Sequence, residues 1–226
     1  MKKTDFTIIA CIVLIGAVFV FMPQVLQAYN TANSEHGMWM SFVKFAVLAT
    51  FGEALALRIR TGHYYHPGFG LLPRALVWGF LGLTIKMAFT VFASGVPVFV
   101  QYLGYEQATT VLKTGPVLGK IGVAFCISTL LNVVYAPVMM TFHKITDTHI
   151  VQNGGTLTGL FKPIHFAQIL KEIDWDRMWN FVFKKTIPFF WIPAHTITFL
   201  LPETLQVLFA ALLSVALGVL LSLKKT

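Results

Sequence analysis

Long apolar runs constrain the fold of this chain more than any other feature of its sequence. Runs of about 20 apolar residues recur along the 226-residue chain, and a helix of that length crosses the roughly 30 Å hydrocarbon core of a bilayer. Only 12% of the residues are charged, whereas a soluble globular domain has about 25%. No segment is left over that could bury a soluble core of its own. The sequence therefore predicts an all-α, polytopic membrane helix bundle that forms a single integral membrane domain, 1–226.

Prolines, glycines and charged residues divide the apolar runs into six predicted transmembrane helices, over residues 6–28, 38–57, 76–96, 116–142, 176–200 and 202–223. The last two share one apolar run, 187–223, which would measure about 55 Å as a single helix. That length exceeds the hydrocarbon core, and Pro202 followed by Glu203 is typical of a helix start. We therefore expect a hairpin that turns at Pro202. The alternative is five spans, with a final helix that protrudes from the membrane.

The positions of Lys and Arg predict the orientation of the chain. With six spans both termini lie on one side, and nearly all Lys and Arg residues outside the helices fall on that side; only Lys113 and Lys120 fall on the other. Since cytoplasmic loops carry an excess of Lys and Arg, we expect both termini in the cytoplasm and the protein in the inner (cytoplasmic) membrane of a bacterium. The same rule accounts for the net charge of +8, so the lipid bilayer, and no nucleic acid, is the predicted partner.

The N-terminal segment, 1–37, is predicted to add an extra helix to a bundle formed by residues 38–223. Its basic start is that of a signal peptide, but the apolar run 6–28 is far longer than the roughly 7–15 apolar residues of such a peptide. We therefore expect a retained membrane helix.

A polar segment, 141–185, separates the fourth and fifth predicted spans. Within it a short helix presents polar residues on one face and apolar residues on much of the rest: His165, Gln168 and Glu172 against Ile164, Phe166, Leu170 and Ile173. This pattern is typical of a helix that lies in the membrane interface. We expect one short interfacial helix here.

Small residues are spaced for close packing between helices. On the sixth predicted helix one recurs every four residues, and two more lie on the third; the set is Ala210, Ser214, Gly218 and Ser222, with Gly79 and Gly82. A stripe of small residues lets the backbone of another helix approach closely. We interpret these positions as packing surfaces rather than as a reactive site.

Four polar or ionisable side chains inside the predicted helices are the candidate functional residues: Glu53, Lys86, Asn132 and His195. An ionisable group near mid-bilayer costs about 2.5–3.5 kcal/mol or more, so it is a pointer to function. Glu53 and Lys86 form either a structural ion pair or part of a water-lined pathway. Asn132 and His195 suit hydrogen bonds between helices as well as a pore, and Pro193 removes a backbone donor beside His195.

The chain lacks the sequence patterns of an enzyme. His63 and His66 in TGHYYHPG could bind a metal, but two loop histidines without a matching acid are more typical of exposed polar residues. No metalloprotease, nucleophile-elbow, P-loop or paired-carboxylate pattern is present. We therefore expect no catalytic residues, no metal and no cofactor.

Four stretches between residues 39 and 223 form an ordered series. They are FGEA at 51–54, Arg74 with GFLG at 79–82, LNVVYAP at 131–137, and a C-terminal group of Trp191, Pro193, Thr198-Phe199, Leu201-Pro202 and Leu221-Ser222. The series resembles the family of the peroxisomal membrane protein of twenty-two kilodaltons and its mitochondrial relative Mpv-seventeen. The resemblance is to a bacterial-type member of that family. The chain departs from the family pattern in having no acid beside Asn132, in the shorter spacing of its prolines and in its extra first helix. The resemblance implies a small helical membrane protein, proposed to form a weakly selective channel for small solutes.

Two functional hypotheses follow. The first is a channel or pore for small solutes or ions, lined by the four intramembrane polar residues. The second is a non-conducting structural or assembly protein, in which the same residues bond one another in a dry interior. A homo-oligomer is compatible with both, and an intramembrane enzyme ranks last.

Overall fold

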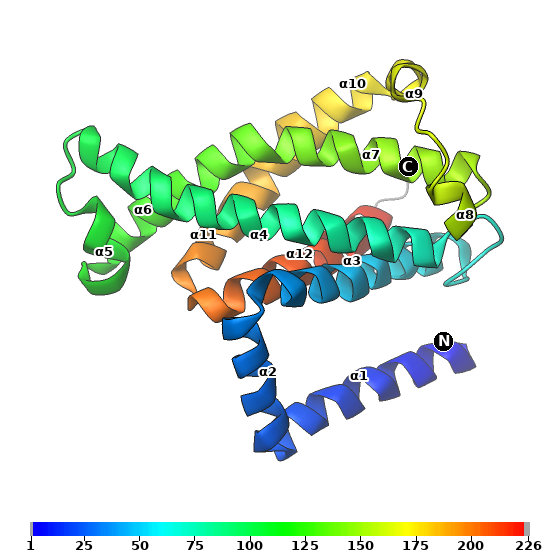
Figure 1. Cartoon of the computed structure of the whole chain (residues 1–226), viewed down its shortest axis with the longest axis horizontal. Coiled ribbons are helices and arrows are strands. Elements are labelled where there is room, and N and C mark those ends of the chain that lie inside the picture. Colours follow the sequence, from blue (N-terminus) through cyan, green and yellow to red (C-terminus); the bar gives the residue numbers. More distant parts are fainter. Residues whose placement is uncertain (1, 224–226) are drawn as a thin grey trace. The chain divides into compact units, whose positions relative to one another are not determined.

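The described part of the chain is all-helical, as the sequence predicts. The structure is a computed structural model that describes residues 2–223; it is 86% helical and contains no strand within that range. In Figure 1 and below, η marks a helix with π-type hydrogen bonds. In chain order the helices are α1 Lys3–Phe21, α2 Pro23–Glu35, α3 Gly37–Thr61, α4 Leu71–Tyr102, α5 Ala108–Thr114, α6 Val117–Leu130, η1 Leu131–Tyr135, α7 Ala136–Gln152, α8 Leu157–Leu160, α9 Phe166–Glu172, α10 Trp175–Arg177, η2 Met178–Trp191, α11 Ile192–Leu200 and α12 Glu203–Leu223 (Figure 1).

Among the described residues, five helices are long and apolar enough to cross a membrane. They are α1, α3, α4, the continuous helix Val117–Gln152 formed by α6, η1 and α7, and residues Glu203–Ser222 of α12. Each overlaps one predicted span. The predicted span 176–200 is not among them, because the π-helical turns of η2 and the short α11 take the place of one long α-helix.

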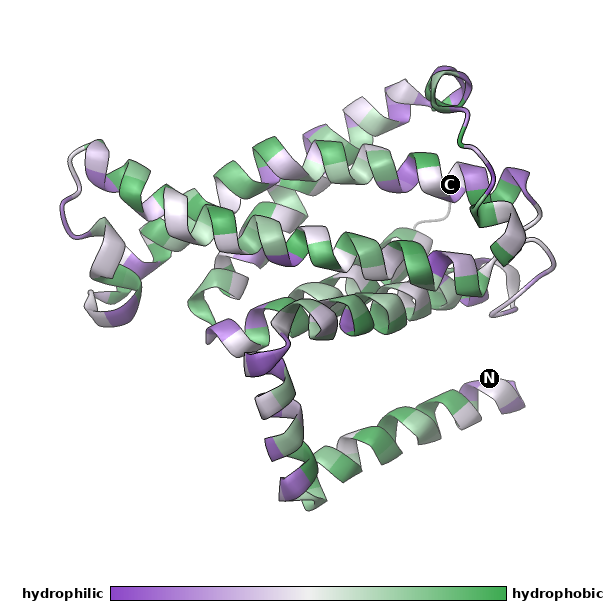
Figure 2. Ribbon diagram, in the orientation of Figure 1, coloured by the Kyte–Doolittle hydropathy of each residue, from purple (hydrophilic) through white to green (hydrophobic). Residues whose placement is uncertain are grey.

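Large apolar side chains cover the outward faces of these helices. Val47 on α3, Phe80 on α4 and Val133 on η1 are each more than half exposed. The helices are apolar along their lengths, and hydrophilic residues gather mainly at their ends and in the connecting segments (Figure 2). Soluble monomers rarely expose contiguous apolar surface of this kind. Exposed apolar faces of this kind are typical of helices that contact lipid.

The described residues divide into two compact units, with the boundary in the sequence between Met40 and Ser41. The first unit contains α1 and α2, which are separate although the sequence predicts one helix over 6–28. Pro23 has no N–H to donate and disfavours helical backbone in the residue before it, and Met22 accordingly adopts φ −119° and ψ 83°. The prediction of one continuous helix is wrong for this reason.

The second unit has a packed apolar core at the end of the bundle that carries α5. Ala108 and Val111 on α5 and Ala124 and Ile127 on α6 are almost completely buried, and they cluster with apolar residues of α4, α11 and α12. Close packing of this kind leaves no room for water between the side chains. The core therefore closes this end of the bundle.

The helices α3 and α12 approach closely at two glycines. A Cβ atom at Gly218 would lie 3.0 Å from the carbonyl oxygen of Gly52, and one at Gly52 would lie 2.9 Å from the Cα atom of Val215. Ala210, on the same stripe of α12, is buried, whereas the Ser222 hydroxyl donates to the carbonyl of its own helix. The contact leaves no space for a side chain at Gly52.

The helices α3 and α4 also pack through glycines. A Cβ atom at Gly79 would lie 2.5 Å from the ring of Phe42, and one at Gly82 would lie 2.6 Å from the carbonyl oxygen of Ser41. Both distances are shorter than real side-chain contacts. The absence of side chains at Gly79 and Gly82 therefore lets α3 pack closely against α4.

Two prolines, Pro97 and Pro137, lie inside continuous helices. Val96 and Pro97 are both buried within α4, and this burial offsets part of the cost of the hydrogen bond that Pro97 cannot donate. Before Pro137, the N–H of Ala136 donates to the carbonyl of Leu131, five residues earlier. The wider π turn accommodates the proline, so the helix continues to the end of α7 rather than to residue 142.

The C-terminal helices α11 and α12 pack against each other as a hairpin. The helix α11 ends at Leu200, Leu201 is extended with φ −76° and ψ 155°, and α12 begins at Glu203, directly after Pro202. Pro193 lies in the first turn of α11, immediately after η2. The chain therefore reverses at the position where the sequence places a helix start.

Candidate functional site

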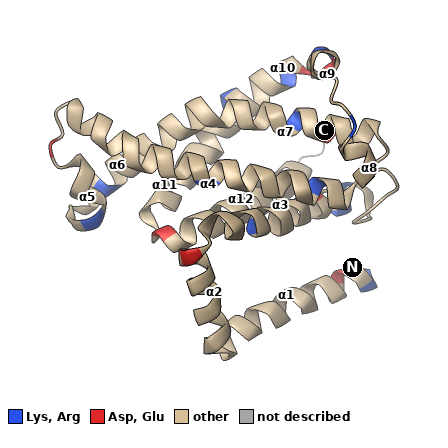
Figure 3. Ribbon diagram, in the orientation of Figure 1, with Lys and Arg blue, Asp and Glu red and all other residues tan. Residues whose placement is uncertain are grey.

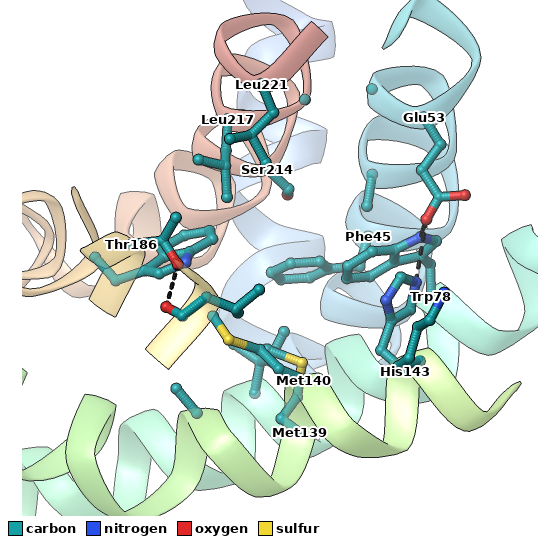
Figure 4. Close-up of a pocket in the computed structure, with 18 of the residues that line it drawn as sticks. Phe45, Glu53, Trp78, Met139, Met140, His143, Thr186, Ser214, Leu217 and Leu221 are labelled. Atoms are coloured by element: carbon teal, nitrogen blue, oxygen red, sulfur yellow. Dashed lines mark hydrogen bonds and ion pairs between the residues drawn. The ribbon is translucent and has the colours of Figure 1, made fainter. Parts of the chain in front are cut away.

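A cavity of about 430 Å³ lies inside the second unit, between α3, α4, η1, α7, η2, α11 and α12. This volume falls in the range of about 300–1,000 Å³ that is typical of small-molecule sites. Figure 4 shows Met139 and Met140 of α7 facing Ser214 and Leu217 of α12 across it. Helices far apart in the sequence thus surround one central space.

The cavity is open at one end and closed at the other. Its exposed lining residues are Arg60 at the end of α3, Lys144 on α7 and Leu221 on α12. At the opposite end the lining residues Asn132 and His195 are at least nine-tenths buried, and the core around α5 lies beyond them. We call the first end the mouth and the second the inner end.

A cluster of polar and charged side chains lies near the mouth, centred on Glu53. One carboxylate oxygen of Glu53 accepts the indole N–H of Trp78 at 2.8 Å and lies 3.1 Å from Nε2 of His143 (Figure 4). The other accepts a hydrogen bond from the guanidinium of Arg74. Arg74 also forms an ion pair with Asp147, so one cation joins two carboxylates from different helices.

The cluster is held in place by its surroundings. The Nε atom of Arg74 donates to the carbonyl oxygen of Phe69 at 2.7 Å, and the guanidinium lies over the Phe69 ring at 4.6 Å. The rings of Trp78 and His143 are 4.4 Å apart between centroids, and Trp78 also stacks on Phe45. These contacts fix the positions of the Arg74, Trp78 and His143 side chains, and so they stabilise the hydrogen bonds and ion pairs of the cluster.

Of the two alternatives for Glu53 and Lys86, the structure does not contain the ion pair between them. The Lys86 ammonium pairs with Glu203, at 3.4 Å, while Glu53 is held by Arg74. Arg74 is the nearer partner because α4 brings it to the same end of the bundle as Glu53, whereas Lys86 lies three turns further along that helix. Among the described residues that line the cavity, Glu53 is present and Lys86 is not.

A second polar group lies at the inner end, where the sequence places Asn132 and His195. The amide nitrogen of Asn132 donates to the carbonyl oxygen of Ser128 at 2.8 Å and lies 3.1 Å from Nδ1 of His195. With Asn132 as the donor, the neutral imidazole carries its proton on Nε2. The N–H of Trp191, which also lines the cavity, has no hydrogen-bond partner within the described part of the chain. The structure thus brings Asn132 and His195 together as a neutral group.

The remaining predicted residues lie outside this site, except for three on α12. Ala210, Ser214 and Gly218 line the cavity, and the Ser214 hydroxyl donates to Ala211 of its own helix at 2.7 Å. The loop histidine His66 lies 2.8 Å from the carbonyl oxygen of Pro67. Residues 2–223 contain no group of three or more His, Cys, Asp or Glu side chains that could hold a metal ion.

Sequence reasoning misses most of the cluster around Glu53. It counts Arg74 as a loop cation, and it places His143 and Asp147 in a polar segment because it ends the fourth helix at residue 142. The spacing from Met140 to His143 and on to Asp147 is three and then four residues, which puts all three on one helix face. If the predicted helix had been extended beyond residue 142, His143 and Asp147 would have appeared as polar residues on the same face as Met140.

The fold and the cavity define an all-helical protein with helices of membrane-spanning length around a central space. Comparison of the chain with protein-family models, with curated proteins and with solved structures found no match.

Proposed function

We propose that this chain is a multi-pass protein of the bacterial inner membrane that forms a passage for small solutes. The cavity carries the proposal, because a bundle that only packs against itself does not need a central space with an open mouth and polar groups at both ends. The resemblance to the Mpv-seventeen family supports the same function. The passage needs no metal, cofactor or catalytic residue.

The proposed arrangement in the membrane has six spans, with η2 and α11 together forming the one that is not a single α-helix. Lys and Arg residues occur around α7 to α10, near the mouth, and Lys113 and Lys120 lie by α5 (Figure 3). By the excess of positive charge, the mouth and both termini face the cytoplasm and α5 faces outward. The helix α9 lies in the interface. Because the core beyond the inner end is dry, this is a closed state, and conduction requires that core to open.

Solute efflux from liposomes tests the proposal. Purified protein in phospholipid liposomes should release radiolabelled organic acids, sugars and amino acids faster than protein-free liposomes do. Leu217→Trp, which fills the cavity, should slow release, while Leu212→Trp on the exposed side of the same helix should not. Vesicles that stay tight to all these solutes, under every gradient and voltage applied, would contradict a passage.

A second candidate function, a non-conducting structural or assembly protein, is favoured by a different observation. Glu53 and Asp147 are paired through Arg74, and Asn132 bonds His195, so these polar groups already satisfy one another. The efflux experiment separates the two functions, since a structural protein leaves the vesicles tight and Leu217→Trp changes only its stability.

A further inference from the structure

The geometry points to a binding site for a single-chain anionic amphiphile, with its headgroup at the mouth between Arg60 and Lys144 and its chain in the cavity. This inference deepens the proposed function, because it names the class of solute that the same cavity takes. A carboxylate and a phosphate monoester share the required chemistry, which is one anionic head on one apolar chain.

The mouth carries two cations that no side chain of residues 2–223 neutralises. Arg60 and Lys144 are exposed, and within residues 2–223 neither side chain takes part in an ion pair. Arg74, by contrast, is buried and holds two carboxylates. Cations without partners at the rim of a cavity with low-dielectric walls attract anions and can donate charge-assisted hydrogen bonds to them.

The acidic side chains of the cavity do not cancel this attraction. Glu53 and Asp147 are both bound to Arg74, and Glu53 is bound to Trp78 as well. The described residues that line the cavity include three Lys and Arg residues and two carboxylates, so the net charge of this set is positive even with neutral histidines. The surplus lies at the mouth, where the headgroup is placed.

The interior beyond the charged cluster is apolar. Phe45, Ile85, Met139, Met140 and Leu217 line it from four helices. In the closed state, a hydrophilic solute held here would lose its water without gaining hydrogen bonds, whereas an apolar chain gains about 25 cal/mol per Å² of surface buried. Methionine side chains are flexible and adapt to chains of different shape. The lining therefore selects an apolar body.

The inner end determines which way the ligand lies. The described residues that line it are Asn132 and His195, which bond each other, and Trp191, whose indole N–H has no partner. None of these three residues is Lys or Arg. An anionic headgroup there would be buried without a cation, which is strongly unfavourable. The headgroup consequently stays at the mouth, and the chain end points toward Asn132.

Photolabelling tests the site directly. Full-length protein in nanodiscs of zwitterionic phosphatidylcholine is incubated with dodecanoate that carries a photoreactive diazirine at the chain end. The sample is illuminated, and the labelled residues are identified by mass spectrometry. We expect saturable labelling of cavity residues of α7 and α12. Unlabelled dodecanoate and dodecyl phosphate should compete, and their relative strength tells a carboxylate from a phosphate preference. Dodecyltrimethylammonium, which has the same chain and opposite charge, should compete at least tenfold less well.

Paired variants locate the headgroup. Arg60→Gln combined with Lys144→Gln should weaken labelling by about tenfold, the loss expected for one charge-assisted hydrogen bond. Lys162→Gln combined with Lys171→Gln removes two exposed cations that do not line the cavity and should leave labelling unchanged. Leu217→Trp should abolish labelling inside the cavity, and thermal melting of each variant verifies that it is folded.

Equal competition by the cationic amphiphile, or labelling confined to outward residues such as Val47, would overturn the inference. The measurement needs no gradient, so it is independent of solute passage. Labelling without efflux would support the binding site and contradict the channel. Efflux of hydrophilic solutes without labelling would support the channel and contradict the proposed ligand class.

Discussion

At the scale of single residues, Arg74 is the group on which the charged cluster depends. It is the one cation that contacts both Glu53 and Asp147 in the described structure, and it is buried. Breaking a buried ion pair is costly because the remaining charge loses its partner and has no water to replace it. Lys86 differs, since its partner Glu203 is 81% exposed and an exposed pair contributes little.

Arg74→Met should therefore destabilise the folded protein by about 3–5 kcal/mol, measured as thermal unfolding in detergent. Adding Glu53→Gln should recover part of the loss, because one of the two unpaired carboxylates is removed. Lys86→Met should lower stability much less. Glu53→Gln combined with Lys86→Met should be additive, since the two residues do not interact. Strong coupling between Glu53 and Lys86, with none between Glu53 and Arg74, would contradict the structure.

At the scale of the helices, glycines set the distance between α3 and its neighbours. Gly52 lies against the backbone of α12, whereas a Cβ atom added at Gly122 on α6 would meet open space. A backbone neighbour cannot rotate away as a side chain can, so a clash there must separate the helices.

Gly52→Val should lower stability by about 1–3 kcal/mol, the usual cost of overpacking, in a thermal unfolding assay in detergent. Gly122→Ala is the matched control and should be neutral or stabilising by up to about 1 kcal/mol, because alanine is the better helix former. If Gly52→Val were as stable as Gly122→Ala, α3 and α12 would not approach as closely as described.

The helices also show what the sequence can and cannot predict. Apolar runs locate five candidate spans, because hydrophobic length alone decides whether a helix reaches across a bilayer. Proline is less informative, since its effect depends on tertiary contacts: Pro23 breaks a helix, while Pro97 and Pro137 sit inside helices. The candidate site is predicted only in part. Asn132 and His195 do meet, but the partner of Glu53 depends on how α4 is placed beside α3.

At the scale of the whole second unit, the main feature is a cavity that is open at one end and closed at the other. The mouth is charged, the middle is apolar, and the inner end is neutral and sealed by the core around α5. The proposed passage for solutes and the proposed amphiphile site both use this space. The proposed function therefore requires that solutes pass through the cavity rather than around the protein.

Reversible blocking of the cavity tests this claim most directly. Ser214→Cys is introduced into a chain whose own cysteines are replaced by Cys11→Ser and Cys126→Ala, and the protein is reconstituted in liposomes. A bulky methanethiosulfonate reagent should stop solute efflux, and a reductant should restore it. Leu212→Cys, on the outward, lipid-facing side of the same helix, is the control, and the reagent should leave its efflux unchanged. Unchanged efflux after complete modification at position 214, verified by mass spectrometry, would contradict the account.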